Sequence, residues 1–127
     1  LSFKSTYDMK KLILLLFIPL VFACGASTEE VIEYYDSGAI EFKYNIDEDD
    51  KKQGEAIYYY ESGEIEAKLN FIDGKLQGEQ IRYYESGEIQ AKVNYKDDKL
   101  HGEDIWYYES GEIQIKTKWK DGNPMKD

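Results

Sequence analysis

Few side chains in this sequence could perform acid–base or nucleophilic chemistry. His101 is the only histidine; it has no second histidine or cysteine as a partner, and it lies in a predicted turn. Repeated serines and one histidine do not assemble a serine–histidine–aspartate set, and there is no glycine-rich phosphate loop. Glutamates recur at three hairpin positions, Glu61, Glu85 and Glu109, which indicates turn chemistry before catalysis. We therefore expect no enzymatic activity and no catalytic residue.

The run Asp47-Glu48-Asp49-Asp50 is the main candidate for a metal site, because carboxylate oxygens bind hard cations. The run lacks the glycine-spaced loop and the distal glutamate of an EF-hand, so a solvated acidic turn is the favoured interpretation. We expect no metal and no cofactor.

Residues 10–24 predict where the protein goes. Lys10 and Lys11 precede the apolar run Leu12–Ala23, which is too short to span a bilayer and is typical of a secretory signal helix. The run ends at Val21-Phe22-Ala23-Cys24, which resembles the lipobox of bacterial lipoproteins. That resemblance implies cleavage before Cys24 and lipid attached to its sulfur. The alternative is an ordinary signal followed by a free thiol.

This interpretation divides the chain into upstream residues and signal peptide (1–23), lipidated Cys24 with a tether (24–30) and a repeat domain (31–127). Gly25, rather than an aspartate, follows the cysteine, so no inner-membrane retention signal is present. We expect a lipid-anchored protein of the bacterial cell envelope, at the outer membrane where the organism has one.

The charge balance limits the partners of the repeat domain. Residues 24–127 carry 13 basic and 25 acidic side chains, a net charge of −12. Such a body should not bind nucleic acid or anionic lipid through general electrostatics, so membrane attachment depends on the lipid. With one cysteine, no disulfide framework forms.

One sequence block repeats along the chain at a nearly fixed period. Tyr-Tyr-Glu-Ser-Gly-Glu-Ile stands at residues 59–65, 83–89 and 107–113, and a looser copy stands at 34–40. Apolar residues alternate with polar ones on both sides of each block, which predicts strands. We therefore expect an all-β fold: an antiparallel meander of about four 24-residue hairpin repeats.

The register of each hairpin can be predicted from its turn. Glu-Ser-Gly suits a three-residue hairpin loop, which would place Tyr83 opposite Ile89 and Ile81 opposite Ala91 on one buried face. Strict alternation from Leu76 would turn Ile81 outward, so a bulge at Gly78 is expected to reset the phase. We expect the firmest packing in the second to fourth repeats and a frayed N-terminal edge.

A second set of aromatic residues then falls on the opposite face of the sheet. An exposed aromatic row suits a protein partner or a sugar platform, although packing within the sheet is an equally favoured interpretation. The predicted partner-binding residues are Tyr58, Tyr60, Tyr84, Trp106 and Tyr108.

The pattern resembles the MORN repeat in its bacterial variant form, which combines a glycine, an aromatic pair, a second glycine and an Asp-Gly-Lys turn. In one copy the matching residues are Gly78, Tyr83, Tyr84, Gly87, Tyr95, Lys99, His101 and Gly102; in the copy before it they are Gly54, Tyr59, Tyr60, Gly63, Phe71, Gly74, Lys75 and Gly78. Residues 54–122 match closely, and 29–53 form a degenerate copy. The resemblance implies the fold; some bacterial members carry an antitoxin label, and the family name invokes membrane association.

Together these features predict a non-enzymatic, lipid-anchored envelope protein whose repeat sheet is a scaffold for protein interaction. A carbohydrate- or cell-wall-binding module is one alternative. An antitoxin-like inhibitor of a partner protein is another.

Overall fold

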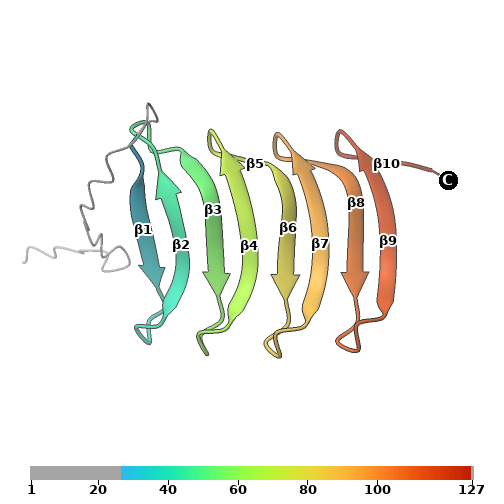
Figure 1. The fold of residues 1–127 in the computed structure, drawn as a ribbon, viewed down its shortest axis with the longest axis horizontal. Coiled ribbons are helices and arrows are strands. Elements are labelled where there is room, and N and C mark those ends of the chain that lie inside the picture. Colours follow the sequence, from blue (N-terminus) through green and yellow to red (C-terminus); the bar gives the residue numbers. More distant parts are fainter. Residues whose placement is uncertain (1–26, 127) are drawn as a thin grey trace, which may run out of the picture.

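The computed structural model describes residues 27–126, which form a single antiparallel sheet (Figure 1). The strands follow one another across the sheet as a meander, as predicted, and the short β5 pairs with β4. They are β1 (Glu29–Tyr34), β2 (Ile40–Ile46), β3 (Lys52–Tyr59), β4 (Ile65–Ile72), β5 (Lys75–Leu76), β6 (Gly78–Tyr83), β7 (Ile89–Lys96), β8 (Lys99–Tyr107), β9 (Ile113–Lys120) and β10 (Asn123–Pro124).

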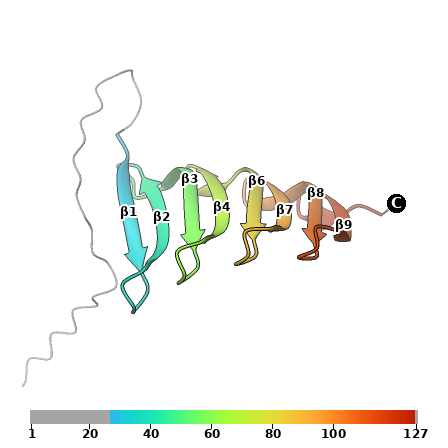
Figure 2. The same ribbon diagram turned by 60° about the horizontal axis from the view of Figure 1, so that its bottom comes forward.

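The sheet is one layer deep, and no helix or second sheet covers either face in the described part of the chain (Figure 2). Within residues 27–126 there is also no helix long and apolar enough to cross a membrane. The predicted signal helix and Cys24 lie outside the described residues.

The Glu-Ser-Gly hairpins form as predicted. At the tip of the β6–β7 hairpin, the Gly87 N–H donates to the Tyr84 carbonyl and the Tyr84 N–H donates to the Glu88 carbonyl, both at 2.8 Å. Gly87 has a φ of +90°, a left-handed conformation that glycine adopts without steric cost. The same pair of bonds recurs at the tips of the other three long hairpins.

Two-residue turns connect one repeat to the next at the opposite end of the strands. Asp73 and Gly74 both have positive φ, the backbone signature of the I′ hairpin turn that Asp-Gly favours. Asp98 takes the glycine position in the next repeat with a φ of +65°, and its carboxylate accepts a 2.7 Å hydrogen bond from the Leu76 N–H. That bond ties a non-glycine turn to the preceding repeat.

The predicted pairing is right at the hairpin tip and wrong one step further from it. Tyr83 lies opposite Ile89, but a bulge then leaves Gln90 without a direct partner and places Ala91 opposite Arg82. Ile81 therefore lies opposite Lys92, not Ala91. The extra residue reverses which side chains share a face, a shift that turn length alone does not reveal.

The predicted phase reset at Gly78 is also wrong. Phe71 pairs with Leu76, and Lys68 pairs with Ile81. The two pairs are three residues apart along β4 but five residues apart along the segment from β5 to β6. Two extra residues restore the original alternation, so Leu76 and Ile81 point to opposite faces. Gly78 is the right place for the irregularity, with a φ of +75°, but the irregularity holds an even number of residues.

The core lies on the face that carries Phe42, which we call the Phe42 face. Its best-packed cluster joins Val31, Phe42, Tyr44 and Ala56, and the Tyr58 ring stacks on Phe42 with centroids 3.8 Å apart. Farther along the sheet, the buried side chains of this face are Ala67, Gln80, Ala91 and Val93. No residue from 99 to 126 is buried, so the fourth repeat is packed most loosely, contrary to the expectation for repeats two to four.

Candidate functional site

The aromatic residues predicted to bind a partner do not share one exposed face. Tyr58 stacks on Phe42 in the core, and Trp106 lies opposite Ala91 and Ile115 on the same Phe42 face. Tyr108 is half exposed at a hairpin tip. The predicted outward row therefore does not exist, because it depended on the wrong register; contact between these residues and a partner stays a prediction.

Tyr60 and Tyr84 instead connect neighbouring repeats. The Tyr60 hydroxyl donates a 2.6 Å hydrogen bond to the carbonyl of Tyr83, and the Tyr84 hydroxyl donates a 2.8 Å bond to that of Tyr107. Tyr35 makes the equivalent 2.6 Å bond to Tyr59. Burial, followed by nearby glutamates, raises the pKa of the Tyr60 and Tyr35 phenols, so both remain protonated donors at neutral pH.

The other face of the sheet carries a row in which isoleucine and lysine alternate across eight strands. Each isoleucine lies opposite a lysine of the neighbouring strand, as in the Lys68–Ile81–Lys92 series. The row, which defines the isoleucine–lysine face, is Ile32, Lys43, Ile57, Lys68, Ile81, Lys92, Ile105 and Lys116.

The lysines of this row differ in their partners. Lys43 forms a 3.0 Å ion pair with Glu30, and Lys116 forms a 2.9 Å pair with Glu103. Lys68 and Lys92, in the middle of the sheet, form no ion pair among residues 27–126. Their ammonium groups are therefore available to a carboxylate from outside the sheet.

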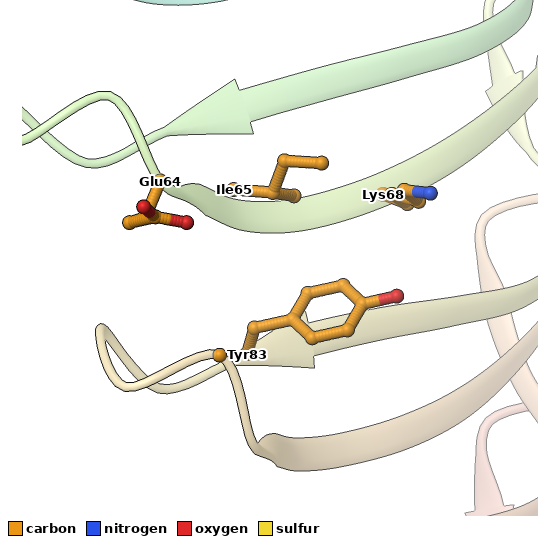
Figure 3. A pocket seen from close by; sticks show the side chains of 5 residues that line it. Glu64, Ile65, Lys68 and Tyr83 are labelled. Atoms are coloured by element: carbon orange, nitrogen blue, oxygen red, sulfur yellow. The ribbon is translucent and has the colours of Figure 1, made fainter.

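Two equivalent hollows open on the isoleucine–lysine face, each containing one of these lysines. The first hollow, about 280 Å³, lies between β4 and β6 and is lined by Glu64, Ile65, Lys68, Tyr83 and Gly87 (Figure 3). The second, about 210 Å³, is lined by Glu88, Ile89, Lys92, Tyr107 and Gly111, one 24-residue repeat later. Ile65 and Tyr83 flank the first hollow from two different repeats, with Glu64 at its hairpin end (Figure 3).

This arrangement has the elements of a recognition site. Each hollow offers an isoleucine and a tyrosine ring as apolar surface, with one ammonium group and one carboxylate to fix orientation. The glycine at each rim keeps the backbone close to the opening, since it adds no side chain there. The lining holds no histidine, cysteine or serine.

The sequence prediction missed these hollows because it placed Tyr83 and Ile89 in a core with Ala91. The signal that could have found them is the 24-residue spacing of Lys68 and Lys92. Once the bulge is counted, these lysines lie on the same side as the isoleucines. Residues repeated at the period of an array reach one face together.

The remaining candidates have structural positions. His101 Nδ1 lies 3.5 Å from the backbone nitrogen of Asp121. One repeat earlier, Gln77 has the same position and accepts a 2.8 Å hydrogen bond from the Asp97 N–H.

Asp47, in the acidic run, accepts hydrogen bonds from the backbone N–H groups of Asp49 and Lys51. The pKa of its carboxyl is lowered mainly by a hydrogen bond from the Gln53 side chain, and further by these backbone bonds. No cluster of three His, Cys, Asp or Glu side chains within 27–126 could hold a metal ion.

Comparison with known proteins agrees with this architecture. The sequence pattern of the MORN repeat variant matches residues 52–73, 76–97 and 100–121, so that each match covers one β-hairpin of the sheet with its Glu-Ser-Gly tip. No curated protein and no solved structure matches the chain significantly. The three matches cover just over half of the sequence, and the chain belongs to the MORN repeat variant family.

Proposed function

We propose that this protein is a non-enzymatic scaffold that binds another protein through the hollows of its isoleucine–lysine face. MORN repeats are generally associated with protein and membrane interaction. The observation that carries the proposal is the repetition of the hollow: the same five residue types recur one repeat apart. Each time the lysine forms no ion pair with another of the residues 27–126. A ligand that uses both hollows must itself be extended or repetitive, as a segment of protein is.

The charge of the hollows defines the partner further. Lys68 and Lys92 each share a hollow with a glutamate, so a partner carboxylate is directed toward the ammonium group and away from that glutamate. We therefore propose a partner segment that presents apolar side chains together with aspartate or glutamate. Two hollows on one rigid sheet gain affinity through simultaneous engagement without any further contact.

Photo-crosslinking in cells tests this binding site. A benzophenone amino acid at Ile65 or Ile89 should crosslink the same protein partner, because both positions line hollows. The control position is Ile72, which is 52% exposed at the far end of β4 and lines neither hollow. Equal crosslinking from Ile72, or different partners from Ile65 and Ile89, would contradict the proposal.

We also propose that Cys24 anchors the protein to the bacterial cell envelope through lipid. The support is the charged, apolar and cysteine-terminated order of residues 10–24. Metabolic labelling with a palmitate analogue should mark the wild-type chain and should leave Cys24→Ala unlabelled and unprocessed. Unchanged processing of Cys24→Ala would rule out the anchor while leaving the scaffold proposal intact.

The glycan-binding alternative has less structural support. It needs open aromatic rings, but Tyr58 is stacked on Phe42, and the hydroxyls of Tyr60 and Tyr84 are engaged in bonds between repeats. The antitoxin alternative depends on the partner. A crosslinked partner whose own activity falls on binding would make this chain an inhibitor.

A further inference from the structure

The edge of the sheet formed by β9 is unusually apolar and open. Ile113 and Ile115 are 58% and 55% exposed, and Tyr108 at the adjoining tip is 50% exposed. Ala91, which occupies the position of Ile115 one repeat earlier, is completely buried between Arg82 and Trp106. Among the described residues, the only strand on this side of β9 is β10, which pairs with Trp119 and Lys120. The Met125 N–H, which follows β10, also donates a 2.7 Å bond to the Lys118 carbonyl, so the edge is open over residues 113–117.

The two edges of the sheet carry opposite charges. β9 contains Lys116, Lys118 and Lys120 and no acidic residue, whereas β1, at the other end of the sheet, contains Glu29, Glu30 and Glu33 and no basic residue (Figure 1). The outer side of β1 also has no strand partner within residues 27–126. Oppositely charged edges attract each other, and edges of like charge do not pair.

We propose that β1 of a second copy of this chain pairs with β9, so that the sheet continues from one molecule into the next. The repeats supply the register. Lys68 lies opposite Ile81 and Lys92 opposite Ile105, so Lys116 is expected opposite Ile32 of the second copy. Two residues further along each strand, Lys118 and Glu30 lie on the same side of the sheet. They approach each other across the seam without forming a direct pair, because the junctions between repeats become irregular after the lysine. Glu30 also pairs with Lys43 within its own molecule.

The tip tyrosine completes the contact. Tyr35, Tyr60 and Tyr84 each donate a hydroxyl bond to a backbone carbonyl in the next repeat, at Tyr59, Tyr83 and Tyr107. Tyr108 follows the same sequence pattern, and its equivalent acceptor is the carbonyl of Tyr34 in the second copy. The interface therefore reuses bonds that already join the repeats inside one molecule.

Lysines and glutamates on edge strands also prevent aggregation, and here that effect gives the contact its polarity. Two β9 edges would bring lysines together, and two β1 edges would bring glutamates together. Only the pairing of β1 with β9 brings opposite charges together. Such a head-to-tail contact does not close on itself, so it produces chains of increasing length.

Sedimentation velocity of the full chain in a mild detergent tests the proposal. We expect association that grows with protein concentration and falls with salt. Glu30→Lys alone and Lys118→Glu alone should each weaken association by about threefold to tenfold, because each brings like charges together across the seam. An equal mixture of the two variants should associate again, since each interface then joins opposite charges. This recovery excludes misfolding as the cause of the single-variant loss.

A tyrosine pair supplies a second, independent test. Tyr108→Phe should weaken association between about twofold and tenfold without changing the stability of the separated molecule. Tyr84→Phe should lower the stability of the separated molecule and leave association unchanged, because the Tyr84 hydroxyl bond lies within one molecule. A monomer at every concentration would overturn the proposal, and so would association that survives both charge reversals or fails to return in the mixture.

Discussion

At the scale of single residues, tyrosines at the hairpin tips join a thin sheet together. Each bond from a tip hydroxyl crosses from one repeat to the next, so it stabilises the array and not the hairpin that carries it. Arrays of small repeats depend on such contacts between neighbours, since one hairpin alone is only marginally stable.

Tyr60→Phe should therefore lower the free energy of unfolding by about 0.5–1.5 kcal/mol, the usual net value of one hydrogen bond. The ring stays in place, so only the bond to the Tyr83 carbonyl is lost. Urea denaturation measures the change. Tyr108→Phe is the matched control and should have no effect on the separated molecule; equal losses in both variants would show that the bond is not the cause.

Tyr44 makes stability sensitive to alkaline pH. Burial, and then its 2.9 Å hydrogen bond to Glu33, raises the pKa of this phenol from 10.0 to about 12. Because the folded-state pKa is above the unfolded one, the stabilisation is complete below pH 10 and is lost as pH rises toward 12. Denaturation across this range should show a decline in stability that is smaller in Tyr44→Phe; identical profiles would contradict the assignment.

At the scale of strands, the number of extra residues in each bulge decides which side chains share a face. The one-residue bulge beside each hairpin tip places the isoleucines on the same face as the lysines. The two-residue irregularity near each repeat glycine does not change the face on which the following residues lie, because it adds an even number of residues. Buried alanines then occupy the middle of the Phe42 face.

Ala91→Ile should cost about 1–3 kcal/mol, because the larger side chain has no room between Arg82 and Trp106. Ile115→Ala is the opposite change at the equivalent position of β9. It should cost clearly less than the roughly 2–5 kcal/mol of an Ile→Ala change at a buried site, because Ile115 is 55% exposed. Thermal denaturation compares them. A larger loss in Ile115→Ala would mean that the faces are assigned incorrectly.

The same strands show what the sequence could predict. Turn positions, strand order and the Tyr83–Ile89 pair follow from the Glu-Ser-Gly and Asp-Gly signals, because these fix backbone conformation locally. The Ile81–Lys92 pair does not follow, because Gln90 can be accommodated only by a bulge whose position depends on neighbouring strands. The hollows were therefore missed, since they lie on the face that the predicted register assigned to the core.

At the scale of the whole molecule, the last repeat is the least packed part of the described sheet. Val31, Phe42, Tyr44 and Ala56 form a cluster near the first edge, and the ammonium of Lys52 lies 4.7 Å from the Phe42 and Tyr44 ring centres. No residue of β9 is buried. A sheet of this kind should open from the β9 side first.

Hydrogen exchange should show this difference between the two ends of the sheet. Backbone amides of β2, which is paired on both sides and contains Phe42 and Tyr44, should exchange more slowly than those of β9 in a sample kept dilute to limit association. Equal protection across the array would indicate that it unfolds as one unit.

The proposed function requires that the lysine-containing hollows bind a protein partner. The most direct measurement is the affinity of the crosslinked partner for Lys68→Glu/Lys92→Glu, compared with Lys75→Glu/Lys99→Glu. Both double variants change the charge equally and at the same 24-residue spacing, but Lys75 and Lys99 are exposed and line neither hollow. We expect the first double variant to lose binding by at least about tenfold and the second to bind almost as the wild type does. Equal losses in the two, or no loss in the first, would contradict the proposed function.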